Sequence, residues 1–134
     1  MILHRKKPVL RSLIRSESGA SAAEFTLVLI PLIMLTLGTI NIGMMIFTAS
    51  TLHFAVEDAA RCASVRTATT CSTAQKIRDY AASVYKGPGG VTVTFTPSSA
   101  ACGNVVTGTA NYVFSTGITS STIPLSMTAC YPLA

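Results

Sequence analysis

The chain contains no tryptophan and few charged residues, because Asp, Glu, Lys and Arg make up only 11% of its 134 residues. A soluble domain typically has a charged fraction of about 25%. The composition is therefore low in charge for a soluble protein. The length allows one small domain together with a membrane segment.

The sequence also lacks the common catalytic motifs. It has no Gly-x-Ser-x-Gly, no His-Glu-x-x-His and no phosphate-binding glycine loop. Its serines and threonines have no evident activating partner, and we interpret His53 as an interfacial or packing residue. We therefore expect no enzymatic activity, no catalytic residue and no cofactor.

Four cysteines are present, and no two of them are spaced as Cys-x-x-Cys. This spacing argues against a zinc site, so we expect no metal. Four cysteines allow three disulfide connectivities. Among these we favour pairing of sequence neighbours, which joins Cys62 to Cys71 and Cys102 to Cys130. Such bonds form on the extracytoplasmic side of a membrane, where they stabilise small domains.

Basic residues concentrate at the N-terminus, before Gly19. Residues 20–134 retain five basic and four acidic residues, a net charge of +1, although the whole chain carries +5. A nucleic-acid interface needs basic residues clustered on the folded domain, so we expect no nucleic-acid partner. Lys and Arg remain on the cytoplasmic side of a span, which predicts a cytoplasmic N-terminus. The basic residues before Gly19 are Arg5, Lys6, Lys7, Arg11 and Arg15.

A long apolar run follows this basic segment. Residues 25–56 contain no Asp, Glu, Lys or Arg, and Glu24 lies directly before them. A bilayer core of about 30 Å needs ~20 helical residues, so we place a transmembrane segment at about residues 25–47 and expect the helix to project beyond it. A cleavable secretory signal is one alternative, but its apolar region is usually about 7–15 residues long. An ordinary uncleaved anchor is the other, and it explains the basic segment and the span equally well but does not explain Gly19 and Glu24 together.

The spacing of Gly19 and Glu24 resembles the processing site of type IV pilin-like proteins. The form Gly-x-x-x-x-Glu-Phe, followed by an apolar run with an early proline, is similar to the TadE-like pseudopilins of tight-adherence (Tad) pili. It comprises Gly19, Glu24, Phe25 and Pro31. The resemblance implies that a prepilin peptidase cuts between Gly19 and Ala20, which makes Glu24 the fifth residue of the mature chain.

The resemblance also implies a role and a set of partners. The protein would be a pseudopilin or minor pilin that takes part in assembling or capping a tight-adherence pilus, and so in surface attachment. Its partners would be the prepilin peptidase, the major pilin, other minor pilins, platform membrane proteins and inner-membrane lipid. We expect Glu24, Phe25 and Pro31 to serve subunit packing, with Glu24 neutralising the new amine of Ala20 on a neighbouring subunit.

The periodicity predicts an α+β fold. Residues 20–66 read as one long helix and residues 73–86 as a short helix, capped by a box from Ser72 to Gln75. Three threonine- and serine-rich strands follow near residues 91–96, 105–115 and 123–129, and they predict an antiparallel meander. Pro124 favours an edge position for the last strand.

These patterns divide the chain into three parts. Residues 1–19 form a leader, residues 20–66 the hydrophobic helix, and residues 67–134 a disulfide-bonded domain on the extracytoplasmic side. The expected location is the bacterial inner membrane, or the pilus after assembly.

Two other functions remain open at this point. In the first of these functions, the threonine- and serine-rich domain acts as an adhesin or as a ligand-binding tip. In the second, the chain is an uncleaved single-pass membrane protein with a binding or sensing domain, unrelated to pili.

Overall fold

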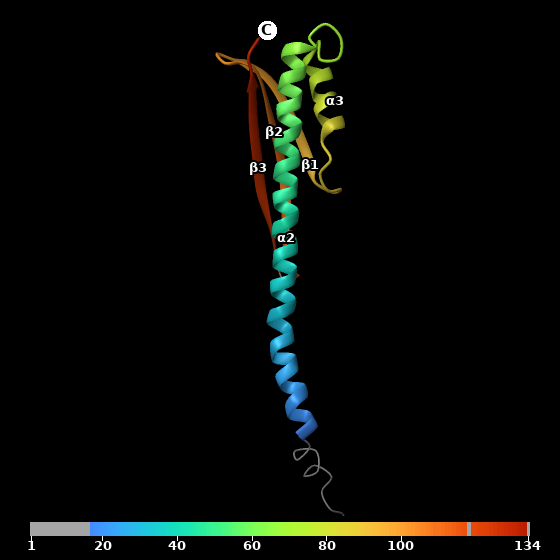
Figure 1. Cartoon of the computed structure of the whole chain (residues 1–134), viewed down its shortest axis with the longest axis vertical. Helices are drawn as coiled ribbons and strands as arrows, with labels where there is room; N and C mark the ends of the chain where they lie inside the picture. Colours follow the sequence, from blue (N-terminus) through green and yellow to red (C-terminus); the bar gives the residue numbers. More distant parts are fainter. Residues whose placement is uncertain (1–16, 118, 134) are drawn as a thin grey trace, which may run out of the picture. The chain divides into compact units, whose positions relative to one another are not determined.

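The computed structural model describes residues 17–117 and 119–133. Its elements follow in the order α2 (Glu17–Val65), α3 (Ala74–Val84), β1 (Thr92–Ala100), β2 (Gly103–Ser115) and β3 (Ser120–Tyr131) (Figure 1). The predicted α+β class, with one long helix, one short helix and a three-stranded sheet, is confirmed. The basic residues of the expected leader, from Arg5 to Arg15, lie outside the described residues.

The three strands form one antiparallel sheet in the order β1-β2-β3. Thr94 pairs with Thr109, and Thr109 pairs in turn with Ser126, so consecutive strands are joined as hairpins. The predicted meander is thus confirmed, and Pro124 lies on an edge strand. An edge strand tolerates proline because its missing N–H costs no ladder hydrogen bond on the open side.

The chain divides into two compact units, residues 1–37 and residues 38–134. The second unit therefore includes the C-terminal half of α2, which the sequence pattern grouped with the hydrophobic helix. This half of α2 belongs to the second unit because its side chains supply most of the buried core of that unit. Helix α3 and strands β1 and β2 supply the rest. The buried cluster comprises Leu52, Ala55, Val56, Ala59, Ala60, Ala81, Phe95, Val106 and Ala110.

The alternating pattern of the strands places one sheet face in this core. On β2 the buried residues include Val106, Gly108, Ala110 and Tyr112, whereas the threonines and Val113 between them are more exposed. This period of two is what the sequence predicts for a half-buried strand. The helices of the second unit cover one face of the sheet, and hydroxyl-bearing residues line the other.

The N-cap of α3 lies one residue after the predicted cap, Ser72. Thr73 is the N-cap, and its side chain accepts a hydrogen bond from the Lys76 amide at 3.3 Å. Gln75 donates instead to Asp79 at 2.9 Å. The predicted Ser72–Gln75 capping box is therefore wrong, because a threonine adjacent to Ser72 caps the helix and puts Lys76, rather than Gln75, at the third helical position.

Candidate functional site

The segment that carries the predicted processing motif is helical. Gly19, Ala20 and Glu24 all lie on α2 with exposed side-chain positions. Ala20 and Glu24 are four residues apart, so they occupy one face of the helix, one turn from each other. Phe25, the next residue, is 65% exposed. The geometry brings the carboxylate within one turn of the residue whose amine a cut after Gly19 would release.

Pro31 lies inside α2, and the helix continues past it. Proline has no amide hydrogen, so it cannot donate to the carbonyl of Leu27 as a regular helix requires. Membrane helices tolerate such a break because other groups satisfy the freed backbone. Nearby, the Thr36 hydroxyl donates back to the carbonyl of Leu32, a local bond typical of hydroxyl residues within helices.

The four cysteines form two disulfides in the second unit. Cys62 bonds to Cys71 with a Cα–Cα distance of 5.9 Å, and Cys102 bonds to Cys130 at 6.3 Å. These are the two neighbour pairs that we favoured among the three connectivities. The first closes the turn after α2, where the Cys71 amide also donates to the Arg66 carbonyl at 3.1 Å. The second ties the β1–β2 turn to β3.

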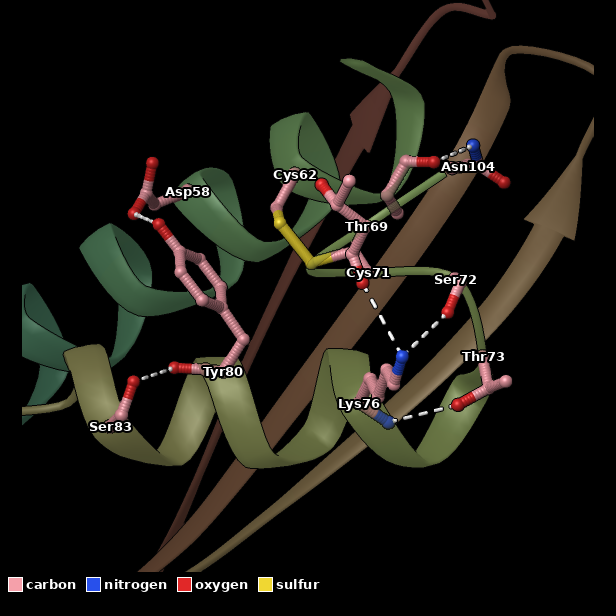
Figure 2. The surroundings of a disulfide bond; sticks show 11 residues. Asp58, Cys62, Thr69, Cys71, Ser72, Thr73, Lys76, Tyr80, Ser83 and Asn104 are labelled. Carbon is pink, nitrogen blue, oxygen red and sulfur yellow. Dashed lines mark hydrogen bonds between the residues drawn. A yellow bond between two sulfur atoms is a disulfide. The ribbon is translucent and has the colours of Figure 1, made fainter. Parts of the chain in front are cut away.

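A hydrogen bond between side chains reinforces the first disulfide (Figure 2). The Tyr80 hydroxyl on α3 donates to the Asp58 carboxylate on α2 at 2.7 Å. This contact, followed by partial burial, raises the pKa of Tyr80 above its ordinary value of 10.0. Lys76 also donates to the Ser72 hydroxyl at 3.1 Å. The disulfide thus ties the segment before α3 to α2, and the Tyr80–Asp58 hydrogen bond, which the sequence did not indicate, joins the two helices.

Two sets of hydrogen bonds hold α2 against the sheet. At the C-terminal end of the helix, the Asn104 amide donates to the Ala63 carbonyl and to the Ser64 hydroxyl, both at 3.1 Å. Ser64 donates in turn to the Tyr131 carbonyl on β3 at 3.1 Å. One polar side chain on β2 therefore satisfies groups in the last turn of α2, where carbonyls lack intrahelical partners.

The second contact lies at the other end of β2. The Tyr112 hydroxyl donates to the Asn41 carbonyl at 3.1 Å, across 71 residues of sequence. Tyr112 is buried, as expected for a core aromatic residue, and its polar tip finds a partner. Together with Asn104, this bond fixes the strand along the helix from Ala63 to Asn41. No local sequence signal pointed to either contact.

His53 and Glu57 form an exposed pair one turn apart on α2. His53 Nδ1 lies 3.7 Å from a carboxylate oxygen of Glu57, and their side chains are 52% and 58% exposed. Glu57 also lines a groove between α2 and β3 with Phe54, Arg61 and Tyr131. Within residues 17–117 and 119–133, no three His, Cys, Asp or Glu side chains gather as metal ligands would.

Residues 19–61 match the family model described as TadE-like protein. The resemblance predicted from the Gly19 motif is therefore confirmed over this segment, which is less than half of the chain. That family is structural and is not known for enzymatic activity. No curated protein and no solved structure matches the chain.

The TadE-like segment covers two physically different stretches of α2. It begins at Gly19, includes Glu24 and Pro31, and continues through the helical residues that pack under the sheet. It ends one residue before Cys62, so the disulfides and the sheet lie beyond it. The helix is long and apolar enough to cross a membrane, which together with the match indicates a membrane anchor.

Proposed function

We propose that this protein is a pseudopilin or minor pilin that a prepilin peptidase cleaves between Gly19 and Ala20. It is held in the inner membrane with its C-terminal domain on the extracytoplasmic side, and it then takes part in assembling or capping a Tad pilus. The observation that carries the proposal is the TadE-like match, which starts at Gly19 itself and includes Glu24 at the required spacing.

The role assigned to Glu24 follows from the cost of an isolated charge in apolar surroundings. A carboxylate within a membrane helix costs about 2.5–3.5 kcal/mol at the helix centre on insertion scales. Cleavage creates a cationic amine on Ala20, and opposite charges attract strongly where water is excluded. When mature helices pack side by side, the amine of one subunit neutralises the Glu24 carboxylate of its neighbour.

The rest of α2 supplies the packing surface. Many of the apolar side chains between Phe25 and Phe47 are exposed in the isolated chain, including Phe25, Leu27 and Val28 at 65–74%. Such surface is stable in lipid before assembly and against other helices after it. The major pilin, other minor pilins and the platform membrane proteins are the corresponding partners, and the disulfide-bonded domain is displayed outside the bundle. The role in surface attachment follows from the pilus.

The experiment compares two valine substitutions in the same helix. Gly19→Val places a branched side chain at the cleavage position and should leave the protein at full length in cells that contain the peptidase. Gly38→Val is the matched control, because an added Cβ at Gly38 meets no atom within 4 Å. The control should be shortened like the wild type.

Intact mass and N-terminal sequencing of the purified protein provide the readout. The wild type and Gly38→Val should begin at Ala20. If Gly19→Val is shortened to the same length, the processing site is not here. If the wild type itself retains residues upstream of Ala20, the chain is an uncleaved membrane protein and the pilin function is refuted.

A further inference from the structure

Strand β3 leaves one side of its main chain open. Strand β2 pairs with one side of β3, and within the described residues no strand pairs with the other (Figure 1). An antiparallel ladder alternates residue pairs that exchange hydrogen bonds with pairs that do not. The Thr116 amide donates to the Thr119 carbonyl at 3.0 Å, so these two residues form a hydrogen-bonded pair. Counting in twos from this pair, the even-numbered residues of β3 direct their N–H and C=O groups to the open side.

Pro124 protects one part of this open side. A proline has no N–H, and on an edge strand it blocks pairing with a further strand. Residues 125–131, in contrast, contain no proline and no charged side chain, although natural edge strands use both against unwanted pairing. In this segment Ser126, Thr128 and Cys130 offer their main-chain groups to a strand from outside.

A groove lies beside this unprotected segment. It has a volume of about 400 Å³ and is bounded by α2 on one side and by residues 128–131 of β3 on the other, within the size range of ligand sites. Phe54 of α2 and Tyr131 of β3 line it and are 61% and 38% exposed. On a strand paired with the open side of β3, alternate side chains point toward α2. Those side chains would enter the groove.

Arg61 supplies the groove with an ionic group that is available for binding. The two carboxylates in the groove already contact other side chains, because Glu57 lies 3.7 Å from His53 and Asp58 accepts the Tyr80 hydroxyl. Among the residues that the structure describes, the Arg61 guanidinium has no ion pair and no hydrogen bond. An acidic side chain on the added strand would complement this charge.

The direction of β3 sets the order of side chains on such a strand. Strand β2 runs antiparallel to α2, because its start contacts Ala63 and its end contacts Asn41. β3 pairs antiparallel with β2, so it runs in the same direction as α2. A strand antiparallel to β3, the more stable arrangement, therefore reaches Arg61 before Phe54. These residues are about 10.5 Å apart along the helix, which a strand covers in three to four residues.

We propose that the open edge of β3 and the adjoining groove bind an extended peptide strand of a partner protein. The strand pairs antiparallel with residues 126–130 and places an acidic side chain against Arg61. Apolar side chains two and four residues later contact Ala129 and Phe54. Main-chain hydrogen bonds supply the affinity and the groove selects the side chains, as in other cases of strand addition. This binding is independent of the pilus role, so a failure to cleave after Gly19 leaves it unchanged.

The probe is a fluorescein-labelled peptide with blocked ends and the sequence Thr-Glu-Thr-Val-Thr-Val-Thr. Its binding to full-length protein in detergent is measured by fluorescence anisotropy. One control peptide has the reversed sequence, and the other has lysine in place of glutamate. We expect the probe to bind about tenfold more tightly than either control, because only the probe places a carboxylate against Arg61 and valines against the apolar part of the groove.

Two pairs of variants test the main-chain and the ionic contact separately. Thr128→Pro removes an N–H on the open side, as Pro124 does naturally, and should weaken probe binding about tenfold or more. Thr122→Pro is its matched control, because Thr122 faces the same open side outside the groove. Arg61→Gln should bind the probe about tenfold more weakly. Arg78→Gln, on α3, should bind it like the wild type.

Several results would overturn the proposal. They are the absence of saturable probe binding by the wild type, equal affinity for the reversed peptide, and wild-type affinity of a Thr128→Pro protein that circular dichroism shows to be folded. Sedimentation of the wild type tests for self-association. Self-association that Thr128→Pro abolishes would mean that a second copy occupies the edge, which also overturns the proposal. If Thr128→Pro does not fold, Arg61→Glu decides: it should prefer the lysine peptide, and an unchanged preference would refute the ionic contact and with it the proposal.

Discussion

Gly108 is the position at which a single added carbon tests the packing of α2 on the sheet. A Cβ built on Gly108 would lie 2.7 Å from Val56 Cγ1, 2.8 Å from Leu52 Cδ1 and 3.2 Å from Phe95 Cε1. Atoms of this kind do not approach so closely, so the Gly108→Ala protein must shift at least one neighbour. Leu52 and Val56 are both fully buried, which leaves them little room to move.

Two opposing effects set the magnitude. Replacing glycine by alanine within regular structure favours folding by roughly 0.5–1 kcal/mol, because the unfolded chain loses freedom. Overpacking a well-filled core costs about 1–3 kcal/mol. We therefore expect a net destabilisation of about 1 kcal/mol or more, which lowers the Tm of a domain of 60–100 residues by ~4–8 °C per kcal/mol. The unit that contains Gly108 falls in this range.

The assay is thermal unfolding of full-length protein in detergent, followed by circular dichroism. Gly89→Ala is the matched control, since an added Cβ at Gly89 meets nothing within 4 Å, and its Tm should stay level or rise. Val56→Ala removes one of the two closest methyl groups, so Gly108→Ala should cost less in that background than alone. If Gly108→Ala raises the Tm as Gly89→Ala does, the close packing of α2 on β2 is wrong.

The remaining predictions concern two ionisable side chains, Glu24 and Tyr80. The Glu24→Gln protein should be cleaved normally, but less of it than of the wild type should be recovered with sheared pili, because the amine of Ala20 loses its partner. Glu57→Gln is the control at an exposed position. Equal recovery of both variants would contradict the pairing of Glu24 with the amine. The hydrogen bond to the Asp58 carboxylate raises the pKa of Tyr80 in the folded protein above its value in the unfolded chain. The stability that this hydrogen bond contributes is therefore fully present below about pH 10 and is lost as the pH rises through the folded pKa. The Tm of Tyr80→Phe should therefore fall less between about pH 9 and pH 11 than that of the wild type, and an identical fall would exclude this linkage.

Local patterns explain why so much of the fold could be predicted. The alternation of Val93 and Phe95 with threonines requires a strand with one buried face, and the uncharged run from Phe25 requires a helix in lipid or in a bundle. The disulfide pairs could be chosen because Cys62 and Cys71 flank a short break between two helices. In each case the sequence pattern that supports the prediction lies within, or within a few residues of, the element that it predicts.

The contacts that join α2 to the sheet had no such signal. Asn104 is a single polar residue near the start of a strand, and its partners lie about 40 residues away on the helix. Gly108 reads as a weak point in β2, yet a side chain added there would meet Val56 and Leu52 of α2. Small and polar residues of this kind acquire their roles only from the element packed against them.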